Sequence, residues 1–386
     1  MFLVIFSEKK DKLHSIPSLS KLPSLSIIIP AYNEEKSIET TIKNVKSLLY
    51  PKRLLEIVAV DDGSTDKTLD ILKKIKGLKV ISKRHGGKAT ALNVALGKAK
   101  GELFAVIDSD SFPKRDALLK SIPYFSDESV KAVTTSIFIY KPRNLLERMQ
   151  QIEYAIIAWG RKLLEFLDSV SVTPGPLSIY RTDTLREIGG FDTKIVTEDI
   201  EIACRLLSKN HKVKMAYDAR TFTRAPSTFK EWWHQRIRWN VGGMQIISKY
   251  GKSIFRSGSF GMFVLPCMIL SFALTFGMLG YGLYRIGKWI MISGTVLSNL
   301  IFFGFNPLYN VQYLFIPDVL TILLLAILVT SLITTRRALR STRITISKKT
   351  ANYIFNLAIY FFVYPGAFVF NMVASLWKFL RKDYMW

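Results

Sequence analysis

The sequence predicts an α/β domain built on a mostly parallel sheet, followed by interfacial helices and a C-terminal transmembrane helix region. Three observations lead to this fold class. Short apolar runs alternate with helical patterns between residues 25 and 110, as is typical of a parallel sheet covered by helices. Two of these runs end directly at acidic residues. From residue 260 onward, apolar stretches become long enough to cross a bilayer.

The predicted strands are buried apolar runs that stop at turn-forming residues. They span 25–29, 55–60, 78–81, 103–107 and 130–140. A helical pattern over 89–100 separates the third run from the fourth. Parallel sheets bind ligands outside the carboxyl ends of their strands. Because Asp61 and Asp108 directly follow two of the runs, we expect a ligand site at that edge.

Two longer helical patterns follow the strands. The segment 144–167 is amphipathic, and we expect it to pack on the sheet or at a domain interface rather than on the membrane. The segment 227–250 combines tryptophans with basic residues, which suits a helix lying among lipid headgroups. The chain thus divides into an N-terminal segment 1–24, an α/β domain 25–226, an interfacial helix 227–252 and a transmembrane region 253–386.

The apolar C-terminal region predicts three full spans, at 260–284, 313–335 and 353–377. We expect the shorter segment 290–305 to be interfacial or re-entrant, with a fourth span as the alternative. Three spans are favoured because four would place the basic loop 336–349 outside the cell. The apolar start of the chain is too short to span and lacks a basic region and a cleavage site. We therefore expect no signal peptide and a cytoplasmic α/β domain attached to the cell membrane.

The charge balance is strongly basic, with 54 Lys and Arg against 30 Asp and Glu and a net charge of +24. Such an excess fits nucleic acid, an anionic membrane face or an anionic substrate. The sequence contains no zinc-knuckle, RNP-like or helix-turn-helix pattern, so we expect no nucleic-acid partner. The lipid bilayer and an anionic ligand remain. The two cysteines, Cys204 and Cys267, offer neither a disulfide framework nor a metal site.

Two aspartates one residue apart, Asp108 and Asp110, come directly off a predicted strand. Such a pair can approach one hard cation, Mg²⁺ or Mn²⁺, which takes oxygen ligands and shares them with substrate phosphates. A capped turn is the alternative. Asp61, at another strand end, suits a hydrogen bond to the base or ribose of a nucleotide. Lys88 follows two glycines at a predicted helix start, where a cation and backbone N–H groups can face a diphosphate.

The motif Thr197-Glu198-Asp199 begins a helical pattern. A Thr197 cap with acids in the first turn explains it structurally. The functional alternative makes Asp199 a general base that removes a proton from an acceptor hydroxyl. We expect Glu198 to be structural.

A glycine–proline turn and a basic–aromatic cluster complete the set of candidates. Gly175 and Pro176 suit a backbone that approaches a sugar closely, although a simple turn explains them equally well. Arg238 could face a diphosphate, and Trp239 could stack on a sugar ring. An interfacial amphipathic helix is the alternative, but it explains less well why Gln235 clusters with them.

Taken in order, these motifs resemble those of the family-2 inverting glycosyltransferases with a GT-A fold. Within that family they are similar to the membrane-embedded synthases of cellulose, chitin, hyaluronan and poly-N-acetylglucosamine. The segment 175–181 is especially similar to hyaluronan and chitin-oligosaccharide synthases. The matching segments are PAYNEE at 30–35, DDGSTD at 61–66, DSD at 108–110, TED at 197–199 and QRIRW at 235–239.

The resemblance implies a role for each candidate on the donor side. Asp61 would bind the uridine of a UDP-sugar, with UDP-GlcNAc or UDP-glucose as the expected donor. Asp108 and Asp110 would hold Mg²⁺ or Mn²⁺ on the diphosphate, and Lys88 would lie nearby. Asp199 would be the catalytic base of a single displacement with inversion.

The resemblance also implies an acceptor side. Gln235 and Trp239 would form the acceptor floor together with Gly175 and Pro176, and Arg238 would clamp the diphosphate. Polymer synthases of this type usually have spans before the catalytic domain, and we expect none here. An acidic residue that often precedes the proline upstream of QxxRW is replaced by an arginine.

We therefore expect a β-linked polysaccharide synthase that uses a glycan acceptor. A single-addition glycolipid synthase with a lipid acceptor is the alternative, because ceramide-type glucosyltransferases share DxD and QxxRW without polymerising. A non-catalytic nucleotide-sugar-binding membrane protein is disfavoured, since every catalytic carboxylate is present.

Overall fold

The computed structural model describes residues 1–256, 258–303, 319–346 and 350–383. An eight-stranded mixed sheet forms the centre of the α/β domain, in the order β3-β2-β1-β4-β7-β6-β8-β5. The strands are β1 (Leu25–Ala31), β2 (Leu55–Asp61), β3 (Lys79–Ser82), β4 (Leu103–Val106), β5 (Ser111–Pro113), β6 (Val130–Ile139), β7 (Ser178–Arg181) and β8 (Lys212–Thr223).

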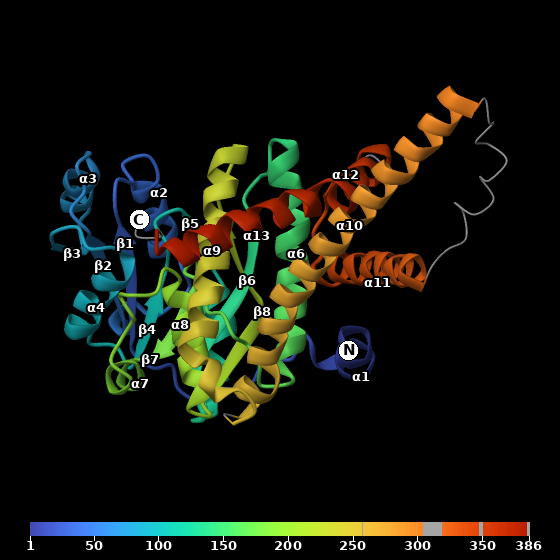
Figure 1. Cartoon of the computed structure of the whole chain (residues 1–386). Helices are drawn as coiled ribbons and strands as arrows, with labels where there is room; N and C mark the ends of the chain where they lie inside the picture. The colour runs from blue at the N-terminus through green and yellow to red at the C-terminus, as the bar shows by residue number, and fades with distance from the viewer. Residues whose placement is uncertain (257, 304–318, 347–349, 384–386) are drawn as a thin grey trace.

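Helices lie on both faces of this sheet (Figure 1). Those that precede the apolar region are α1 (Phe2–Lys9), α2 (Ile38–Lys46), α3 (Thr68–Lys74), α4 (Lys88–Lys98), α5 (Ala117–Ser121), α6 (Leu145–Glu165), α7 (Thr182–Glu187), α8 (Glu198–Ser208) and α9 (Phe229–Tyr250). Both α6 and α9 begin with a capping box, in which the first polar side chain and a glutamate three residues later satisfy each other's backbone N–H groups.

The first half of the sheet is parallel and carries the strand ends on which the site depends. β1 pairs in parallel with both β2 and β4, and β2 pairs in parallel with β3. β7 runs antiparallel between β4 and β6, whereas β6 and β8 are parallel. The predicted mostly parallel α/β sheet is confirmed, with β7 and the short β5 running against the other strands.

Alternating side chains of the strands feed two hydrophobic clusters, one on each face of the sheet. In β1, Ile28 belongs to the cluster beneath α4, α6, α8 and α9. Its neighbours Ile27 and Ile29 belong to the cluster beneath α2, α3 and α5. This period of two is the geometry of a strand buried on both faces. All three isoleucines are fully buried.

Most predicted elements are present, and β8 is the longest strand that the sequence did not predict. The helix predicted over 144–167 forms as α6 and packs on β6 and β8, which confirms the sheet-facing alternative. The N-terminal helix α1 also packs on α6, since Phe2 and Phe6 contact the ring of Trp159 at centroid distances of 6.2 and 5.5 Å.

The C-terminal region is helical, and two of its segments are long and apolar enough to cross a membrane within the described residues. These are Phe260–Thr295 and Ala351–Arg381. The third predicted span, 313–335, begins outside the part of the chain that the structure describes. The helices of this region are α10 (Leu265–Phe303), α11 (Val319–Thr342), α12 (Thr350–Phe362) and α13 (Tyr364–Arg381).

The segment 290–305, expected to be a separate interfacial or re-entrant segment, instead continues the preceding helix as far as the structure describes it. Residues 265–303 form the single helix α10. Polar side chains do not interrupt it, because they bond to their own helix; Thr295 Oγ1, for example, donates to the carbonyl of Met291 at 3.0 Å.

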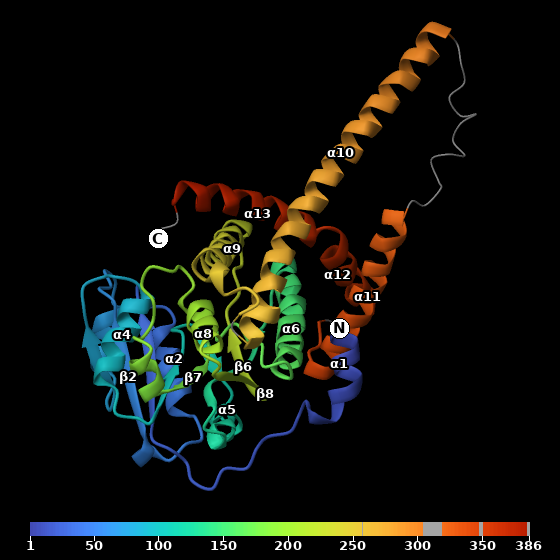
Figure 2. The same cartoon turned by 60° about the horizontal axis from the view of Figure 1, so that its bottom comes forward.

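The C-terminal helices take different directions relative to the α/β domain (Figures 1 and 2). α10 and α11 extend away from the domain, whereas α13 crosses over α9. Asn371 of α13 accepts a hydrogen bond from Asn240 Nδ2 at 3.0 Å and donates one to the carbonyl of Trp233 at 2.9 Å. The apolar C-terminal region is therefore attached to the α/β domain in part through α9. It is also attached through α11 and α12, which pack on α6.

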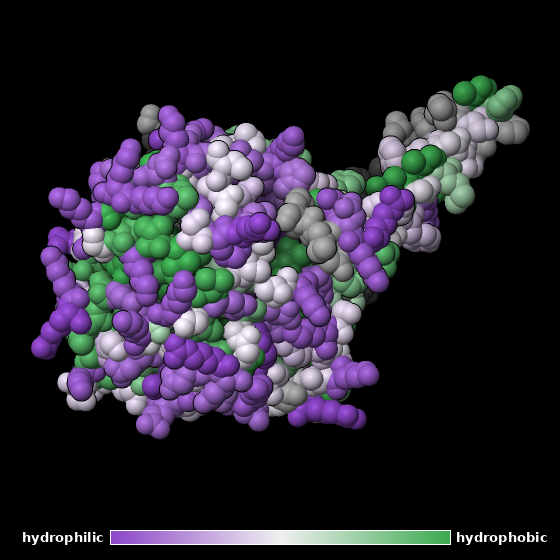
Figure 3. Space-filling model, turned by 90° about the vertical axis from the view of Figure 1, so that its left-hand side faces the viewer, coloured by the Kyte–Doolittle hydropathy of each residue, from purple (hydrophilic) through white to green (hydrophobic). Residues whose placement is uncertain are grey.

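The outer surface of the domain differs from that of the projecting helices. Hydrophilic side chains cover much of the face that carries α3 and α4 (Figure 3). On α10, by contrast, large apolar side chains such as Leu270, Leu274 and Met278 are exposed. An exposed apolar surface of this length calls for a non-aqueous neighbour.

Candidate active site

The predicted site residues converge on one cavity of about 350 Å³ beside the end of β4. Its walls are built by α4, α6, α8 and α9 and by the loops that follow β4 and precede β7. Of the predicted residues, Asp61 lies outside this cavity. Those that line it are Lys88, Asp108, Asp110, Gly175, Pro176, Asp199, Gln235, Arg238 and Trp239.

The ammonium of Lys88, the first residue of α4, joins two carboxylates from different parts of the fold. Lys88 Nζ lies 2.6 Å from Asp108 Oδ1 and 3.0 Å from Glu198 Oε1. Burial alone would lower the pKa of Lys88, but the two carboxylates raise it above its ordinary value. The lysine therefore stays charged. Glu198, for which we expected only a structural role, lines the cavity and pairs with Lys88.

Gly175 lets this ion pair lie directly against the loop before β7. A Cβ atom at this position would overlap both the carboxylate of Asp108 and the ammonium of Lys88. The carbonyl of Gly175 also accepts a hydrogen bond from the N–H of Asp108 at 3.0 Å. The close approach expected at this glycine therefore serves the ion pair, and its contact with an acceptor stays a prediction.

Asp110 is the more enclosed member of the aspartate pair. Burial, together with the charges of Asp108 and Glu34, raises the pKa of Asp110 to about 6. Its Oδ1 accepts hydrogen bonds from Ser111 Oγ at 3.2 Å and Thr223 Oγ1 at 3.4 Å. Crowded carboxylates of this kind fit a divalent cation, which offsets their repulsion and takes its other ligands from phosphate and water. No group of three or more His, Cys, Asp or Glu suited to a metal occurs among the described residues.

Asp199 follows Glu198 in the first turn of α8, and the loop before Gly175 holds its backbone. Thr173 donates from its N–H and its hydroxyl to the carbonyl of Asp199, at 3.2 and 2.9 Å. Burial and the charge of Glu198 raise the pKa of Asp199 to about 6. Burial acts on Glu198 too, but Lys88 outweighs it and lowers the pKa of Glu198.

Helix α9 packs directly on the start of α8. A Cβ atom on Gly242 of α9 would overlap the side chain of Thr197. Thr197 occupies the N-cap position of α8, yet its hydroxyl makes no capping hydrogen bond and is buried without a partner in the described structure. The predicted Thr197 cap is therefore wrong, because the hydroxyl faces α9 rather than the helix start.

The three candidates on α9 share one helical face, as their spacing of three and four residues requires. Gln235 and Trp239 are half-buried in the cavity wall. Gln235 Oε1 has no hydrogen-bond partner within the described part of the chain. The charge of Arg238 acts on the acids of α8 and lowers the pKa of Glu198. The cluster thus forms the part of the cavity wall that α9 contributes.

Asp61 ends β2, and β1 lies between it and β4. Two strand spacings separate these strands, a distance of about 10 Å. The buried carboxylate of Asp61 accepts hydrogen bonds from the N–H of Ser64 at 3.3 Å and from Ser82 Oγ at 3.2 Å. The structure therefore places Asp61 on the same sheet edge as the cavity but does not bring it into the cavity wall.

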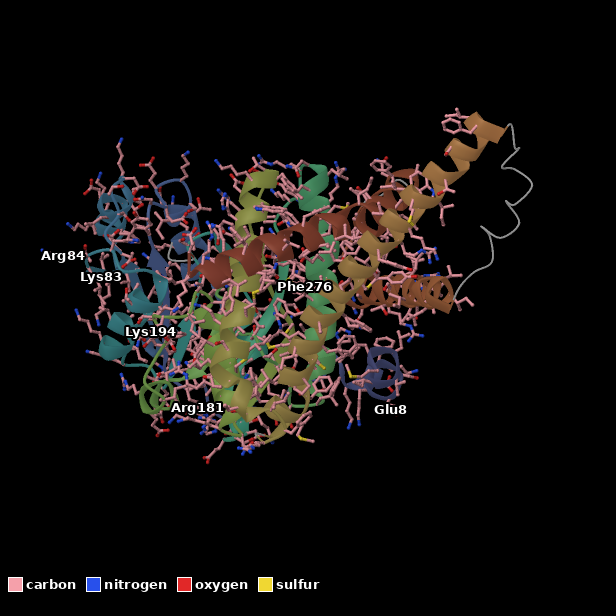
Figure 4. All side chains as sticks on the ribbon, viewed as in Figure 1. Glu8, Lys83, Arg84, Arg181, Lys194 and Phe276 are labelled. Atoms are coloured by element: carbon pink, nitrogen blue, oxygen red, sulfur yellow. The ribbon has the colours of Figure 1, made fainter. Side chains whose placement is uncertain are left out.

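The glycine loop that precedes α4 is held by the second acid of the DDGSTD segment. Asp62 accepts hydrogen bonds from the N–H groups of Gly86 at 3.2 Å and Gly87 at 2.7 Å. It also forms an ion pair with Lys83, and its Oδ2 lies 3.0 Å from His85 Nδ1. The expectation that these N–H groups face a diphosphate is wrong, because Asp62 occupies them. Lys83 lies at the outer edge of the domain (Figure 4).

The family of this domain follows from the comparison with known proteins. Residues 26–189 match the protein-family model described as Glycosyl transferase family 2, and this range includes the strand ends, Lys88 and the aspartate pair. The chain contains a family 2 glycosyltransferase domain.

Curated relatives are also glycosyltransferases. The chain is 32% identical over 252 residues to a probable glycosyltransferase, YdaM, of Bacillus subtilis, over 62% of this chain and 60% of that protein. It is 28% identical over 254 residues to the poly-beta-1,6-N-acetyl-D-glucosamine synthase of Staphylococcus aureus, over 64% and 61%. The chain thus spans about three-fifths of the length of these relatives.

A solved structure supports the fold of the glycosyltransferase domain. The mannosyltransferase PcManGT from Pyrobaculum calidifontis, solved in complex with GDP-Man and Mn²⁺, is similar with a TM-score of 0.55 at 22% identity. The similarity covers 75% of this chain and 88% of that one.

The cavity of the glycosyltransferase domain contains side chains that the sequence did not single out. Besides Glu198, they include Tyr154 and Arg161 of α6 and Arg224 after β8. Burial lowers the pKa of Arg161 to about 10, while Asp199 opposes this shift. Tyr154 and Arg161 are seven residues apart, which places both on one face of the helix predicted over 144–167. This spacing is the feature of the sequence that could have identified these two residues.

A methyl group at Gly175 tests the role of this close approach. We expect Gly175→Ala to displace Lys88 from Asp108 and to destabilise the fold by about 1–3 kcal/mol, since it overfills a packed site. Gly97→Ala in α4 is the matched control, because a Cβ there meets no atom within 4 Å. Thermal unfolding and metal-dependent nucleotide binding are the measurements. Equal binding and stability in Gly175→Ala and the wild type would contradict the role assigned to this glycine.

Proposed function

We propose that the protein is a membrane-associated, inverting glycosyltransferase that moves a sugar from a UDP-sugar to a glycan acceptor. One observation carries the proposal: Asp199 lies in the same cavity as the Asp108–Asp110 pair and the Gln235–Trp239 cluster. A base, a metal-binding pair and an acceptor surface around one space are the parts that a single displacement requires.

The donor is assigned to the sheet edge between Asp61 and Lys88. Asp61 is assigned to the nucleobase, beside the stacked rings of Tyr32 and His85, whose centroids lie 4.1 Å apart. Among the cations that line the cavity, Lys88 and Arg238 are assigned to the diphosphate. A UDP-sugar is favoured because the resemblance is to UDP-sugar enzymes and because one relative is named as an N-acetylglucosamine polymer synthase.

Asp108 and Asp110 would hold Mg²⁺ or Mn²⁺. When bound, the metal offsets the charge that grows on the departing diphosphate. The two carboxylates would supply oxygen ligands to the metal and would thereby anchor the donor at the end of β4. The neighbouring Lys88 adds a fixed positive charge on the same side of the cavity.

Asp199 removes the proton of the acceptor hydroxyl as that oxygen attacks the anomeric carbon. The C–O bond to the diphosphate breaks as the new glycosidic bond forms, so the configuration inverts and UDP leaves with the bonding electrons. Gln235 and Trp239 orient the acceptor, through the unpartnered Oε1 and the indole face respectively. Carbohydrates commonly bind through such a combination of a polar anchor and an aromatic surface.

A polysaccharide product is the favoured outcome, and a single-addition glycolipid is the alternative. The polymer is supported by the resemblance of the ordered motifs and by the relative that is named as a poly-beta-1,6-N-acetyl-D-glucosamine synthase. Attachment to the bilayer is supported by the two apolar helical segments and by the exposed apolar face of α10.

A donor panel tests the reaction itself. Full-length protein in detergent or native membranes, supplied with Mg²⁺ or Mn²⁺, is expected to release UDP from UDP-GlcNAc or UDP-glucose. Product sizing separates the alternatives, since a ladder of oligosaccharides indicates a polymer synthase and one lipid-linked product indicates the glycolipid enzyme. Absence of UDP release from every common UDP-sugar would refute the proposal.

Replacing the base separates chemistry from binding. We expect Asp199→Asn to lower the transfer rate by about 100- to 10,000-fold, the usual contribution of a general base, while UDP affinity changes little. The exposed Asp183→Asn on α7 is a matched control. Calorimetric titration with UDP and metal reports binding. Loss of nucleotide binding in Asp199→Asn would contradict the assignment as base.

The rate should depend on pH through the same carboxylate. Asp199 must be ionised to accept a proton, and its pKa is raised to about 6. We therefore expect kcat to fall as the pH drops through about 6 and to level off above it. Measurement at saturating metal keeps Asp110 ionised, so the remaining acidic limb reports Asp199. A flat profile between pH 5 and 8 would exclude Asp199 as the titrating base.

A further inference from the structure

A chain of buried polar contacts runs behind the acceptor surface, from α13 through α6 to α9. Trp232 Nε1 donates to the hydroxyl oxygen of Tyr364 at 2.7 Å, and that hydroxyl donates to Glu153 Oε2 at 2.8 Å. The same carboxylate oxygen accepts from Arg236 Nη2 at 2.6 Å. Arg236 is 1% exposed and Glu153 is 9% exposed, so these contacts are shielded from water.

The chain of contacts ends at the ring of Trp239. The guanidinium carbon of Arg236 lies 3.9 Å from the centroid of that ring, which is close contact for a cation over an aromatic face. Trp239 lines the active-site cavity, whereas Arg236, Glu153 and Tyr364 do not. These three residues therefore touch the acceptor surface from behind, through one side chain.

The burial of the Arg236–Glu153 ion pair is costly, and this cost suggests that the network has a function beyond stability. Burying an Arg–Glu pair costs desolvation energy, and apolar replacements are often as stable. Arg236 Nε and Nη1 are buried with no hydrogen-bond partner in the described ranges. The ring face of Trp239 is thus a main contact of the buried guanidinium of Arg236. Each of the two side chains therefore restricts the position of the other.

The network also borders a second cavity. Glu153 and Tyr364 line a space of about 540 Å³ among α6, α11, α12 and α13. Arg236 bridges from this pair to Trp239 on the active-site side. Direct contacts therefore connect α13 to Trp239 at the cavity wall.

We propose that Glu153, Arg236 and Tyr364 are positioning residues that hold Trp239 in place for the acceptor and connect α13 to the transfer step. This inference rests on the proposed function. The donor side is assigned to Lys88, Arg238 and the aspartate pair. Within the described residues, no hydrogen bond or ion pair joins the network to any of them. Disruption of the network should therefore raise the KM for the acceptor and leave nucleotide binding intact.

Arg236→Lys is the sharpest variant. Lysine keeps the positive charge beside Glu153 but lacks the planar group that stacks on an indole ring. We expect the melting temperature and the Kd for UDP with Mn²⁺ to stay close to wild type. The acceptor KM should rise by about 5- to 30-fold, as expected from loss of a desolvated cation–π contact. UDP-GlcNAc and an oligosaccharide of β-1,6-linked N-acetylglucosamine are the probes.

Tyr364→Phe tests the connection to α13 and serves if Arg236→Lys fails to fold. It removes the hydroxyl that bonds Glu153 and Trp232 while keeping the ring. Tyr360→Phe is the matched control, because its ring stacks on Tyr364 at 5.6 Å and no hydrogen bond of its hydroxyl is found within the described residues. We expect a raised acceptor KM in Tyr364→Phe and wild-type values in Tyr360→Phe.

A second readout does not depend on activity. The emission of Trp239, taken as the difference between each full-length protein and its Trp239→Phe counterpart, should shift in Arg236→Lys and Tyr364→Phe. If the wild type transfers no sugar but this emission shifts, the proposed function fails and the positioning role stands. If transfer occurs and both variants leave acceptor KM and emission unchanged, the positioning role is overturned.

Discussion

Lys88 links the two halves of the cavity through its ion pairs, and the geometry of the site depends on that link. Four carboxylates, from Asp108, Asp110, Glu198 and Asp199, meet where β4 ends and α8 begins. Like charges at such short range repel in a partly buried site. The ammonium pairs with one acid from each side, so the aspartate pair and the start of α8 keep a fixed separation.

Close packing at two glycines makes this arrangement sterically possible. Gly175 lets the loop before β7 lie against the ion pair, and Gly242 lets α9 lie against Thr197. The second contact brings the Gln235–Trp239 face of α9 to the cavity, and α13 rests on the other side of α9. Where α13 contacts it, the single helix α9 thus lies between the apolar C-terminal region and the cavity.

The parts of the structure that depend on local sequence were the parts that the sequence predicted. Apolar runs followed by acidic residues located β2 and β4 and predicted a site at that edge of the sheet. Helical periodicity located α6 and α9. The long strand β8 was missed although its buried residues alternate. The roles of Glu198 and Asp62 were missed because their partners, Lys88 and the Gly86–Gly87 amides, lie far away in the sequence and meet them only in the fold.

Glu198 and Asp199 are neighbours in the sequence, but the pKa values of their carboxyl groups shift in opposite directions. Both lie in the first turn of α8, where the helix dipole favours negative charge, and burial acts on both. The difference is the direct contact with Lys88, which lowers the pKa of Glu198, and the charge of that ionised glutamate then raises the pKa of Asp199. Two carboxylates whose pKa values are driven apart can take separate roles. The paired acid keeps the site assembled, and the other is left with a proton affinity suited to a base near neutral pH.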